Sequence, residues 1–380
     1  MKAYCLNNIS KVALAGLKSP DKVVEKIEDA DSILVRSANM LEMDLEKNIL
    51  AVARAGAGVN NIPLQKYADA GVVVFNTPGA NANAVKEFVL CALFLACRDI
   101  IGGNKWVNEN KADENIAKTA EKAKAQFAGI EIQGKTLAVV GLGVIGVKVA
   151  NAASALGMNV IGYDPYLSIN NAMQLSKNVK YCEKLTDVVK DADFITIHVP
   201  AMYSTKKMIN KEVFDSLNKN AILINFSRDT LVNDDDLEAA LESGKIVKYV
   251  TDFANTKVVN FKNTIVLPHL GASTEEAEDN CAVMAIDELK DFIENGNVTH
   301  SVNYPDINAG PKNGTRIVVN HKNIPGILAE CTTVVKNQGR NITNFVSKAK
   351  GDYAISILDV DGTVDVSNMC HEGIIRVRVI

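Results

Sequence analysis

Residues 136–146 read TLAVVGLGVIG, an apolar run that ends in a glycine-rich turn. Gly141 suits a tight turn from strand to helix, Gly143 lets the backbone approach a diphosphate, and Gly146 lets the helix pack closely on its strand. The free N–H groups that open such a helix would bind the diphosphate. The stretch therefore predicts a dinucleotide site made by Gly141, Gly143, Val144, Ile145 and Gly146.

An acidic residue supports this site and indicates which dinucleotide binds. A second apolar run, residues 159–163, ends at Asp164, roughly 20 residues after the glycine turn, where the fingerprint requires an acid. A carboxylate there accepts hydrogen bonds from the adenosine ribose hydroxyls and repels a 2′-phosphate. We therefore expect NAD rather than NADP. The alternative to a dinucleotide site is an ordinary βαβ unit whose turn is tightened by glycine.

Length and composition bound the class of protein. The 380 residues are too many for one typical core and predict two or three domains. A net charge of -4 gives no reason to expect nucleic acid or an anionic membrane as a partner. No apolar run approaches the roughly 18 residues that span a bilayer, and residues 1–8 lack a secretory apolar region, so a cytoplasmic protein is expected. Seven cysteines without a C-x-x-C pair, and no histidine cluster, predict free thiols and no metal site.

Short β-rich runs alternate with helical patterns along the first 300 residues. The runs are residues 32–36, 72–75, 136–140, 159–163, 194–198, 221–225, 248–251 and 264–267. This alternation predicts α/β architecture with doubly wound parallel sheets. Helical residues 85–98 and 277–295 are candidate hinges between domains. Residues 301–314 are rich in loop formers and predict a linker, after which the order of patterns resembles βαββαβ in a small α+β unit.

Two residues at predicted strand ends suit oxidation of an alcohol beside a carboxylate. Arg228 follows the run 221–225, and His269 follows the run 264–267. A guanidinium binds a carboxylate through a bidentate fork, and an imidazole accepts the hydroxyl proton as hydride leaves. Taken alone, each residue is more often structural, but open parallel sheets place their sites at these strand ends.

The sequence resembles the D-isomer-specific 2-hydroxyacid dehydrogenases nearly from end to end. The motifs that carry the resemblance are VRS at 35–37, ARAGAGVNN at 53–61, FNTPG at 75–79, GLGVIG at 141–146, YDP at 163–165, HVP at 198–200, SR at 227–228, Asp252 and PHLGAST at 268–274. The resemblance implies that a hydroxyacid is oxidised with NAD, and extra positive charge suits a phosphorylated substrate.

Roles follow from the resemblance residue by residue. It implies that Arg228 and His269 are catalytic and also lie beside NAD. It places the substrate against Arg36, Ser37, Arg54, Ala57 and Gly58. It adds to the NAD site Thr77, Asp164, His198, Val199, Pro200, Thr205, Ser227, Asp252, Gly271 and Ala272. It also implies that a Rossmann NAD domain, residues 98–287, is inserted in a flavodoxin-like substrate-binding domain made of residues 1–97 and 288–310.

One departure from the family pattern concerns the catalytic histidine. The family usually pairs this histidine with a glutamate shortly after the strand that carries Asp252, and a simple register places Lys257 there. Either another carboxylate, such as Glu275 or Asp252, takes the role, or His269 acts unassisted with a pKa near 6.5. A weak or specialised enzyme is a third possibility.

Residues 315–380 resemble the ACT domain, a small ferredoxin-like module that binds regulatory ligands. The signature is HKNIPGIL at 321–328, followed by GRNI at 339–342. The resemblance implies that His321, Asn323 and Asn341 hold L-serine between paired domains. Because one domain supplies half a site, a homodimer or homotetramer is expected. The alternative is that His321 and Asn323 only cap a turn and a helix.

Two other functions stay open at this stage. Another D-2-hydroxyacid, such as a lactate or glycerate homologue, would leave Arg36 and Arg54 superfluous. A non-catalytic NAD-sensing or scaffolding protein could use the same fold, and the lysine at position 257 favours that interpretation. Intact Arg228 and His269 count against it. The fold alone does not decide between these functions.

Overall fold

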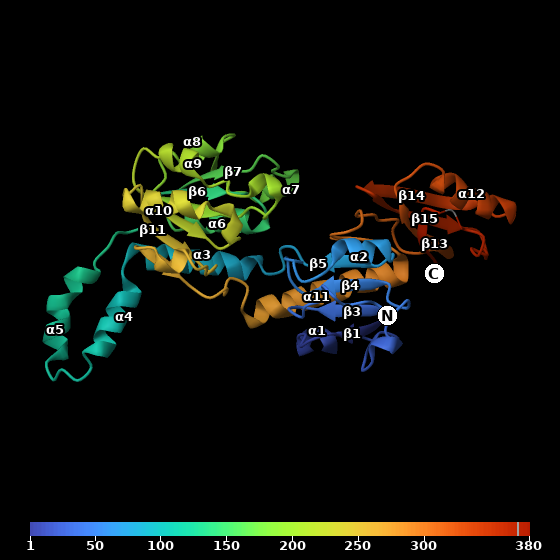
Figure 1. Cartoon of the computed structure of the whole chain (residues 1–380), viewed down its shortest axis with the longest axis horizontal. Helices are drawn as coiled ribbons and strands as arrows, with labels where there is room; N and C mark the ends of the chain where they lie inside the picture. The colour runs from blue at the N-terminus through green and yellow to red at the C-terminus, as the bar shows by residue number, and fades with distance from the viewer. Residues whose placement is uncertain (371) are drawn as a thin grey trace. The chain divides into compact units, whose positions relative to one another are not determined.

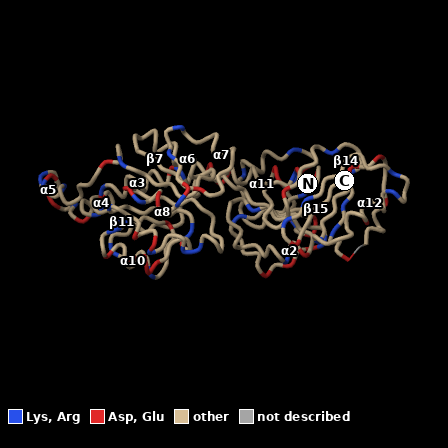
Figure 2. Tube along the Cα trace, turned by 90° about the horizontal axis from the view of Figure 1, so that it is seen from above, with Lys and Arg blue, Asp and Glu red and all other residues tan. Residues whose placement is uncertain are grey.

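The protein is described by a computed structural model that covers residues 1–370 and 372–380 (Figure 1). The chain forms two compact units. Unit 1 contains residues 1–81 and 275–380, and unit 2 contains residues 82–274. Lysines and arginines alternate with acidic residues along both units (Figure 2). No described helix is long and apolar enough to cross a membrane.

Unit 1 is built on a five-stranded sheet in the order β2-β1-β3-β4-β5, with every pair parallel. Its strands are β1 (Lys2–Cys5), β2 (Lys22–Val24), β3 (Ser32–Val35), β4 (Ala51–Arg54) and β5 (Val73–Asn76). Its helices are α1 (Lys11–Ala15), α2 (Leu64–Asp69), α11 (Glu275–Asn295) and the short 3-10 turn η1 (Ile27–Asp29). Apolar clusters cover both faces of the sheet, as burial of a parallel sheet requires.

Unit 2 contains a seven-stranded parallel sheet in the order β12-β11-β10-β9-β6-β7-β8. Its strands are β6 (Thr136–Val140), β7 (Asn159–Tyr163), β8 (Lys180–Tyr181), β9 (Phe194–Ile197), β10 (Ala221–Asn225), β11 (Ile246–Thr251) and β12 (Thr264–Val266). The order reverses at β6, which is the switch point of a doubly wound fold. The predicted α/β class is confirmed, and the runs 136–140, 159–163 and 221–225 match strands residue for residue.

Helices cover both faces of this second sheet. One cluster includes side chains of α3 (Ala82–Cys97) and α6 (Val144–Ala155), and the other includes side chains of the helices that follow β8, β9 and β10. The remaining elements are α4 (Ile100–Glu109), α5 (Ile116–Ala123), α7 (Ile169–Gln174), α8 (Leu185–Val189), α9 (Lys211–Asp215), α10 (Asp234–Glu242), and the 3-10 turns η2 (Lys124–Phe127), η3 (Tyr203–Thr205), η4 (Asp229–Leu231) and η5 (Val258–Asn260). Helices α4 and α5 form a hairpin that extends away from the sheet (Figure 1).

Residues 315–380 form a four-stranded antiparallel sheet in the order β14-β15-β13-β16. Its elements are β13 (Thr315–Lys322), α12 (Ile327–Asn337), β14 (Ile342–Lys350), β15 (Tyr353–Val360) and β16 (Ile374–Val379). The strand order is that of a ferredoxin-like fold. The prediction of a second helix is wrong, because the described residues between β15 and β16 form turns and coil. That segment, beginning Asp361-Gly362-Thr363, is rich in turn formers and β-branched residues, which disfavour a helix. Val364 and Met369 of this segment are buried in the apolar cluster of the C-terminal sheet, where side chains of the second helix were expected.

The division of the chain differs from the expected domain boundaries. Unit 2 begins with α3 at Ala82 and ends at Thr274, before α11, whereas the sequence suggested boundaries near residues 97 and 288. Helix α3 packs with α6 inside unit 2, and the apolar face of α11 packs in the core of unit 1. Each helix therefore belongs wholly to one unit, because its apolar face is buried there.

Arg316 joins the C-terminal sheet to the linker and to the end of α11. Its fully buried guanidinium pairs with Asp359 through Nε at 2.6 Å and Nη2 at 2.8 Å. It also donates to four main-chain carbonyls, those of Asn295, Ala309, Gly310 and Pro311. The hydrogen bonds from Arg316 to Asp359 hold the pKa of the Asp359 carboxyl below its usual value. Each nitrogen of the Arg316 guanidinium thus donates to an acceptor, as a buried cation requires.

Replacing Arg316 with methionine should destabilise the protein strongly. The change leaves the Asp359 carboxylate buried without its partner, which costs about 3–5 kcal/mol of unfolding free energy. Urea titration followed by circular dichroism measures the loss. Lys105→Met, which breaks an exposed ion pair with Glu109, is the control and should change stability little. A small effect of Arg316→Met would contradict this role, and the double variant with Asp359→Leu should recover part of the loss.

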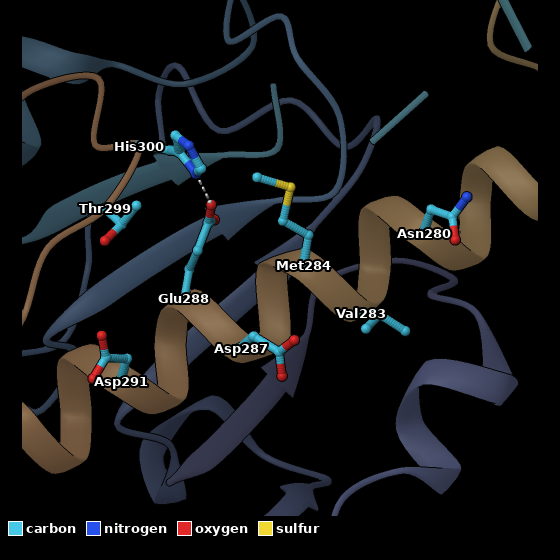
Figure 3. A pocket seen from close by; sticks show the side chains of 8 residues that line it. All are labelled: Asn280, Val283, Met284, Asp287, Glu288, Asp291, Thr299 and His300. Carbon is cyan, nitrogen blue, oxygen red and sulfur yellow. Dashed lines mark hydrogen bonds and ion pairs between the residues drawn. The ribbon is translucent and has the colours of Figure 1, made fainter. Parts of the chain in front are cut away.

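A second buried carboxyl lies on α11 beside the segment that follows it. Glu288 is 8% exposed, and its Oε1 is 2.8 Å from Nδ1 of His300, while Oε2 has no partner among the described residues (Figure 3). Burial, with the charges of Asp306 and Asp287, raises the pKa of Glu288 to about 9. His300 has a φ of +62°, a conformation that L residues seldom adopt. The pair borders a hollow of about 440 Å³.

Glu288 should make the protein less stable as pH rises. In the unfolded chain its carboxyl ionises near pH 4.5, whereas in the folded chain it stays protonated to about pH 9. The folded state binds the extra proton between these values, so its stability declines across them. Urea titrations of Glu288→Gln at several pH values should show a shallower decline than the natural protein. Glu294→Gln, on the same helix and exposed, should keep the original slope; an unchanged slope in Glu288→Gln would contradict the assignment.

Candidate active site

The glycine turn after β6 has the geometry that a diphosphate requires. Gly141 has a φ of +97°, and a Cβ there would lie 2.7 Å from the His198 carbonyl. A Cβ at Gly146 would lie 1.9 Å from the carbonyl oxygen of Gly141, so the helix could not pack as closely. At Gly143 a Cβ would meet nothing within 4 Å. The first and third glycines thus permit the turn, and the second faces open space.

Free donors surround that open space. In the described chain, no acceptor is bonded to the main-chain N–H groups of Gly143, Val144, Ile145 and Gly146. They begin α6, a helix of 12 residues, whose positive end favours an anion. The residues present therefore fit the diphosphate of a dinucleotide.

Asp164 is fixed beside this turn at the end of β7. Its Oδ2 accepts from the N–H of Leu142 at 2.8 Å, and its Oδ1 accepts from the N–H of Tyr166 at 2.8 Å. Each carboxylate oxygen retains a further acceptor position. The carboxylate is thus held in place and can still accept from ribose hydroxyls.

The loop after β9 carries the next predicted group, His198, Val199, Pro200 and Thr205. Burial lowers the pKa of His198 to about 3, so its ring is neutral. Its Nε2 lies 3.0 Å from Oγ1 of Thr196, and Nδ1 has no partner among the described residues. The Thr205 hydroxyl donates to the Pro200 carbonyl at 2.7 Å and accepts from the N–H of Met202. Thr205 therefore closes the loop with its own hydrogen bonds.

Arg228 and His269 both lie close to the ring of Phe253. The Arg228 guanidinium carbon is 5.7 Å from the centre of the Phe253 ring, and the His269 ring is 4.6 Å from it. Because β11 lies between β10 and β12 in the sheet, Phe253 follows the strand between the two that precede Arg228 and His269. The sequence analysis missed Phe253, although its place after the Asp252 strand could have indicated it.

Asp252 is an acid of unit 2 that interacts electrostatically with His269. It is 2% exposed, its Oδ2 accepts from the N–H of Gly271 at 3.2 Å, and Oδ1 has no partner among the described residues. Burial raises the pKa of Asp252, and the nearby charges of His269 and Arg228 oppose the rise. Lys257 instead pairs with Asp235 on α10 at 2.5 Å.

Three other residues of the NAD group are also placed by hydrogen bonds or packing. Ser227 donates from Oγ to the Ile197 carbonyl at 2.7 Å, and its own carbonyl accepts from Nη1 of Arg228. Ala272 is partly exposed beside Gly271. A Cβ at Gly271 would lie 3.3 Å from the Asp252 carboxylate, so a small residue suits that position.

The predicted substrate arginines lie together in unit 1. Arg36 follows β3, Arg54 ends β4, and Nε of Arg54 donates to the Arg36 carbonyl at 3.1 Å. The Arg36 guanidinium forms an ion pair with Glu278 of α11, a residue that the sequence analysis missed. We call the adjoining space, about 340 Å³, the Arg36 hollow. It is lined by Asn8, Ile9, Ser10, Arg36, Ala55, Glu278 and Ala282.

The turn after Arg54 offers unbonded donors in the same unit. The N–H groups of Ala57, Gly58 and Val59 have no acceptor in the described chain. Asn76 fixes the turn by donating to the Ala57 carbonyl at 2.6 Å. Ser37 accepts from Asn7 at 3.4 Å, and Thr77 is fully buried with its N–H bonded to Gly56. The arrangement suits a carboxylate on the turn and a second anion near Arg36.

The residues predicted to bind serine are divided between the two ends of the C-terminal sheet. Asn323 follows β13 and donates to the Gly351 carbonyl at 3.1 Å, whereas Asn341 precedes β14 at the opposite end. His321 is 3% exposed, and both ring nitrogens have partners, the Ser356 hydroxyl and the Lys322 carbonyl. One chain therefore does not gather the three side chains.

The described part of the chain contains no cluster of metal-ligating side chains. No group of three or more His, Cys, Asp or Glu residues there could hold a metal ion. The described cysteines are free thiols, and Cys97, Cys281 and Cys331 are buried.

Comparison with known proteins agrees with the geometry of unit 2. Residues 90–271 match the sequence model of the D-isomer specific 2-hydroxyacid dehydrogenase, NAD binding domain. A D-3-phosphoglycerate dehydrogenase of Methanocaldococcus jannaschii is 34% identical over 80% of this chain, which spans 57% of that relative. The D-3-phosphoglycerate dehydrogenase of Escherichia coli is 28% identical over 96% of this chain and 90% of the length of that enzyme.

A solved structure has the same fold. The NAD-bound 3-phosphoglycerate dehydrogenase of Entamoeba histolytica superposes with a TM-score of 0.62 and 25% identity, over 80% of this chain and 98% of the other. The cofactor implied by the glycine turn and Asp164 is therefore NAD. Residues 90–271 are thus a NAD binding domain of the D-isomer-specific 2-hydroxyacid dehydrogenases.

Proposed function

We propose that this protein oxidises 3-phospho-D-glycerate to 3-phosphohydroxypyruvate with NAD, the first step of phosphorylated serine biosynthesis. The observation that carries the proposal is the placement of Arg228 and His269 around Phe253 at the carboxyl edge of the NAD sheet. The names of the relatives from Methanocaldococcus jannaschii and Escherichia coli support the substrate. The Arg36 hollow adds a cation suited to the phosphate.

The groups of unit 2 divide the chemistry between them. Arg228 binds the carboxylate of the hydroxyacid and polarises the oxygen on C2. His269 accepts the proton of the C2 hydroxyl and returns it in the reverse direction. The chemistry that NAD supplies when bound is acceptance of the hydride from C2. Two electrons and one proton thus leave C2 with the hydride, and the hydroxyl proton passes to the imidazole.

Asp252 supports His269 in place of the usual glutamate. Its carboxylate is close enough for its charge to act on the imidazole, and a negative charge stabilises the imidazolium that forms when the proton arrives. Lys257, bonded to Asp235, lies outside this arrangement. The family glutamate is therefore replaced by a residue already present in the NAD site.

Replacement of His269 should remove most of the turnover and leave NAD binding intact. His269→Ala should lower kcat with 3-phospho-D-glycerate about 10²–10⁴-fold, because a general base is removed. NADH formation is measured with hydrazine to trap the keto acid, and NADH binding is measured by fluorescence. Lys257→Ala is the control and should keep near-normal turnover. Near-normal turnover of His269→Ala would refute the catalytic role.

The same assay separates the candidate functions. D-lactate and D-glycerate are tested in parallel, and turnover of these in preference to the phosphorylated acid would identify a different dehydrogenase. NADH binding without turnover of any hydroxyacid would favour a non-catalytic NAD-binding role.

We infer that the protein is a homodimer or homotetramer. The α4–α5 hairpin extends from the sheet of unit 2 (Figure 1) and leaves Ile100, Ile101 and Val107 between 46% and 49% exposed. Apolar side chains on an extended hairpin favour association with a second copy. A second copy would also bring Asn341 of one C-terminal sheet toward Asn323 of another.

We infer further that residues 315–380 form an ACT domain that binds L-serine between two copies. Asn323 and Asn341 supply exposed amides. The His321 ring, bonded to the Ser356 hydroxyl and the Lys322 carbonyl, positions the start of the turn that carries Asn323. The opposite ends of one sheet can meet only through a partner. The cytoplasmic location expected from the sequence stays a prediction.

Serine should slow the reaction through this module. L-serine should reduce turnover of 3-phospho-D-glycerate, whereas D-serine should have little effect. Asn341→Ala should remove the inhibition and leave uninhibited turnover unchanged, because Asn341 is far from Arg228 along the chain and lies outside unit 2. Sedimentation of the same samples should give the mass of a dimer or tetramer. Full turnover at saturating serine in an oligomer would demote the module to assembly.

A further inference from the structure

The Arg36 hollow already contains an anion of its own. Glu278 lies in the first turn of α11 and pairs with Nη1 of Arg36. Its side chain is 43% exposed and that of Arg36 is 33% exposed, so both border the hollow rather than the core. The cation expected to bind the substrate phosphate is thus shared with a carboxylate of the same chain.

The Arg36–Glu278 pair contributes little to stability. Half-exposed ion pairs are weak, because solvent screens them and both side chains lose rotamer freedom. The neighbouring Asp279 has a different arrangement, since its carboxylate accepts from the Ser10 hydroxyl and joins α11 to the segment before α1. In the described chain Glu278 makes no other ion pair. Its carboxylate is therefore free to leave Arg36 when a stronger anion arrives.

The guanidinium of Arg36 can bind only one anion well through a given edge. Its planar fork matches a phosphate or a carboxylate through two parallel hydrogen bonds. A phosphate that approaches Nη1 meets a like charge unless Glu278 moves away. Arg54 does not relieve this competition, because its Nε is bonded to the Arg36 carbonyl and its guanidinium lies against Gly56.

We propose that Glu278 competes with the phosphate of the substrate for Arg36 and thereby weakens the binding of phosphorylated hydroxyacids to the hollow. The inference rests on the proposed function. A doubly charged phosphate outcompetes the carboxylate, whereas a weakly charged or neutral group in that place does not. Glu278 therefore raises KM for a hydroxyacid that carries a phosphate and leaves KM unchanged for one without it.

The test is Glu278→Gln, which keeps the size of the side chain and removes its charge. With 3-phospho-D-glycerate, KM should fall about two- to fivefold, the amount that a half-exposed ion pair is worth, and kcat should change less than about twofold. KM for D-glycerate should not change, because that acid has no phosphate. Inorganic phosphate should inhibit the variant at a correspondingly lower concentration.

Glu276→Gln is the matched control. Glu276 lies in the same first turn of α11 and is exposed, so this variant removes the same charge without touching Arg36. Its KM should stay near that of the natural protein. An equal fall in both variants would mean that only the general field of α11 matters and would overturn the proposal.

Two further outcomes separate the proposal from the proposed function. A rise in KM for the phosphorylated acid in Glu278→Gln would show that Glu278 positions Arg36 and would overturn the competition. If the natural protein does not turn over 3-phospho-D-glycerate, the proposed function fails, but calorimetric titration with inorganic phosphate still tests the hollow. Tighter phosphate binding by Glu278→Gln than by Glu276→Gln would then support the competition, and equal binding would refute it.

Discussion

The structure depends on one constraint, that parallel strands must be covered on both faces. Helices and apolar side chains occupy both faces of the two parallel sheets. Polar chemistry is thereby confined to the strand ends, where loops begin. Arg36, Arg228 and His269 follow strands for this reason, Arg54 is the last residue of β4, and the glycine turn follows β6. The position of the site is thus a consequence of burial before any ligand is considered.

The sequence predicted the elements with strong local patterns and missed those without them. The run TLAVV ends at a glycine turn, and its strand matched to the residue. Strand β4, Ala51–Arg54, was not predicted, because three small or β-branched residues before an arginine form a weak signal. The prediction of a second helix in the C-terminal module was wrong, since the βαββαβ order was inferred from the succession of strand-like runs and no helical pattern lies between residues 360 and 373.

Residues that act through distant contacts could not be found from the sequence. Phe253 joins Arg228 and His269 only because β10, β11 and β12 are adjacent in the sheet. Glu278 is one acid among several at the start of α11, and only the fold brings it to Arg36. The candidate residues beside the glycine turn needed no such information, because the spacing from Gly141 to Asp164 depends on one local βαβ unit.

The docking of the C-terminal sheet has a consequence for the linker that precedes it. One face of this sheet contributes Val318, Ile355 and Ile357 to the core of unit 1. Arg376 donates to the Ile49 and Ala70 carbonyls, and Lys322 and Tyr353 both bond to Asp69. The peptide connection is therefore not what keeps the module in place. Two separately synthesised fragments, divided within the linker, would be expected to find each other and restore the folded unit without a covalent bond.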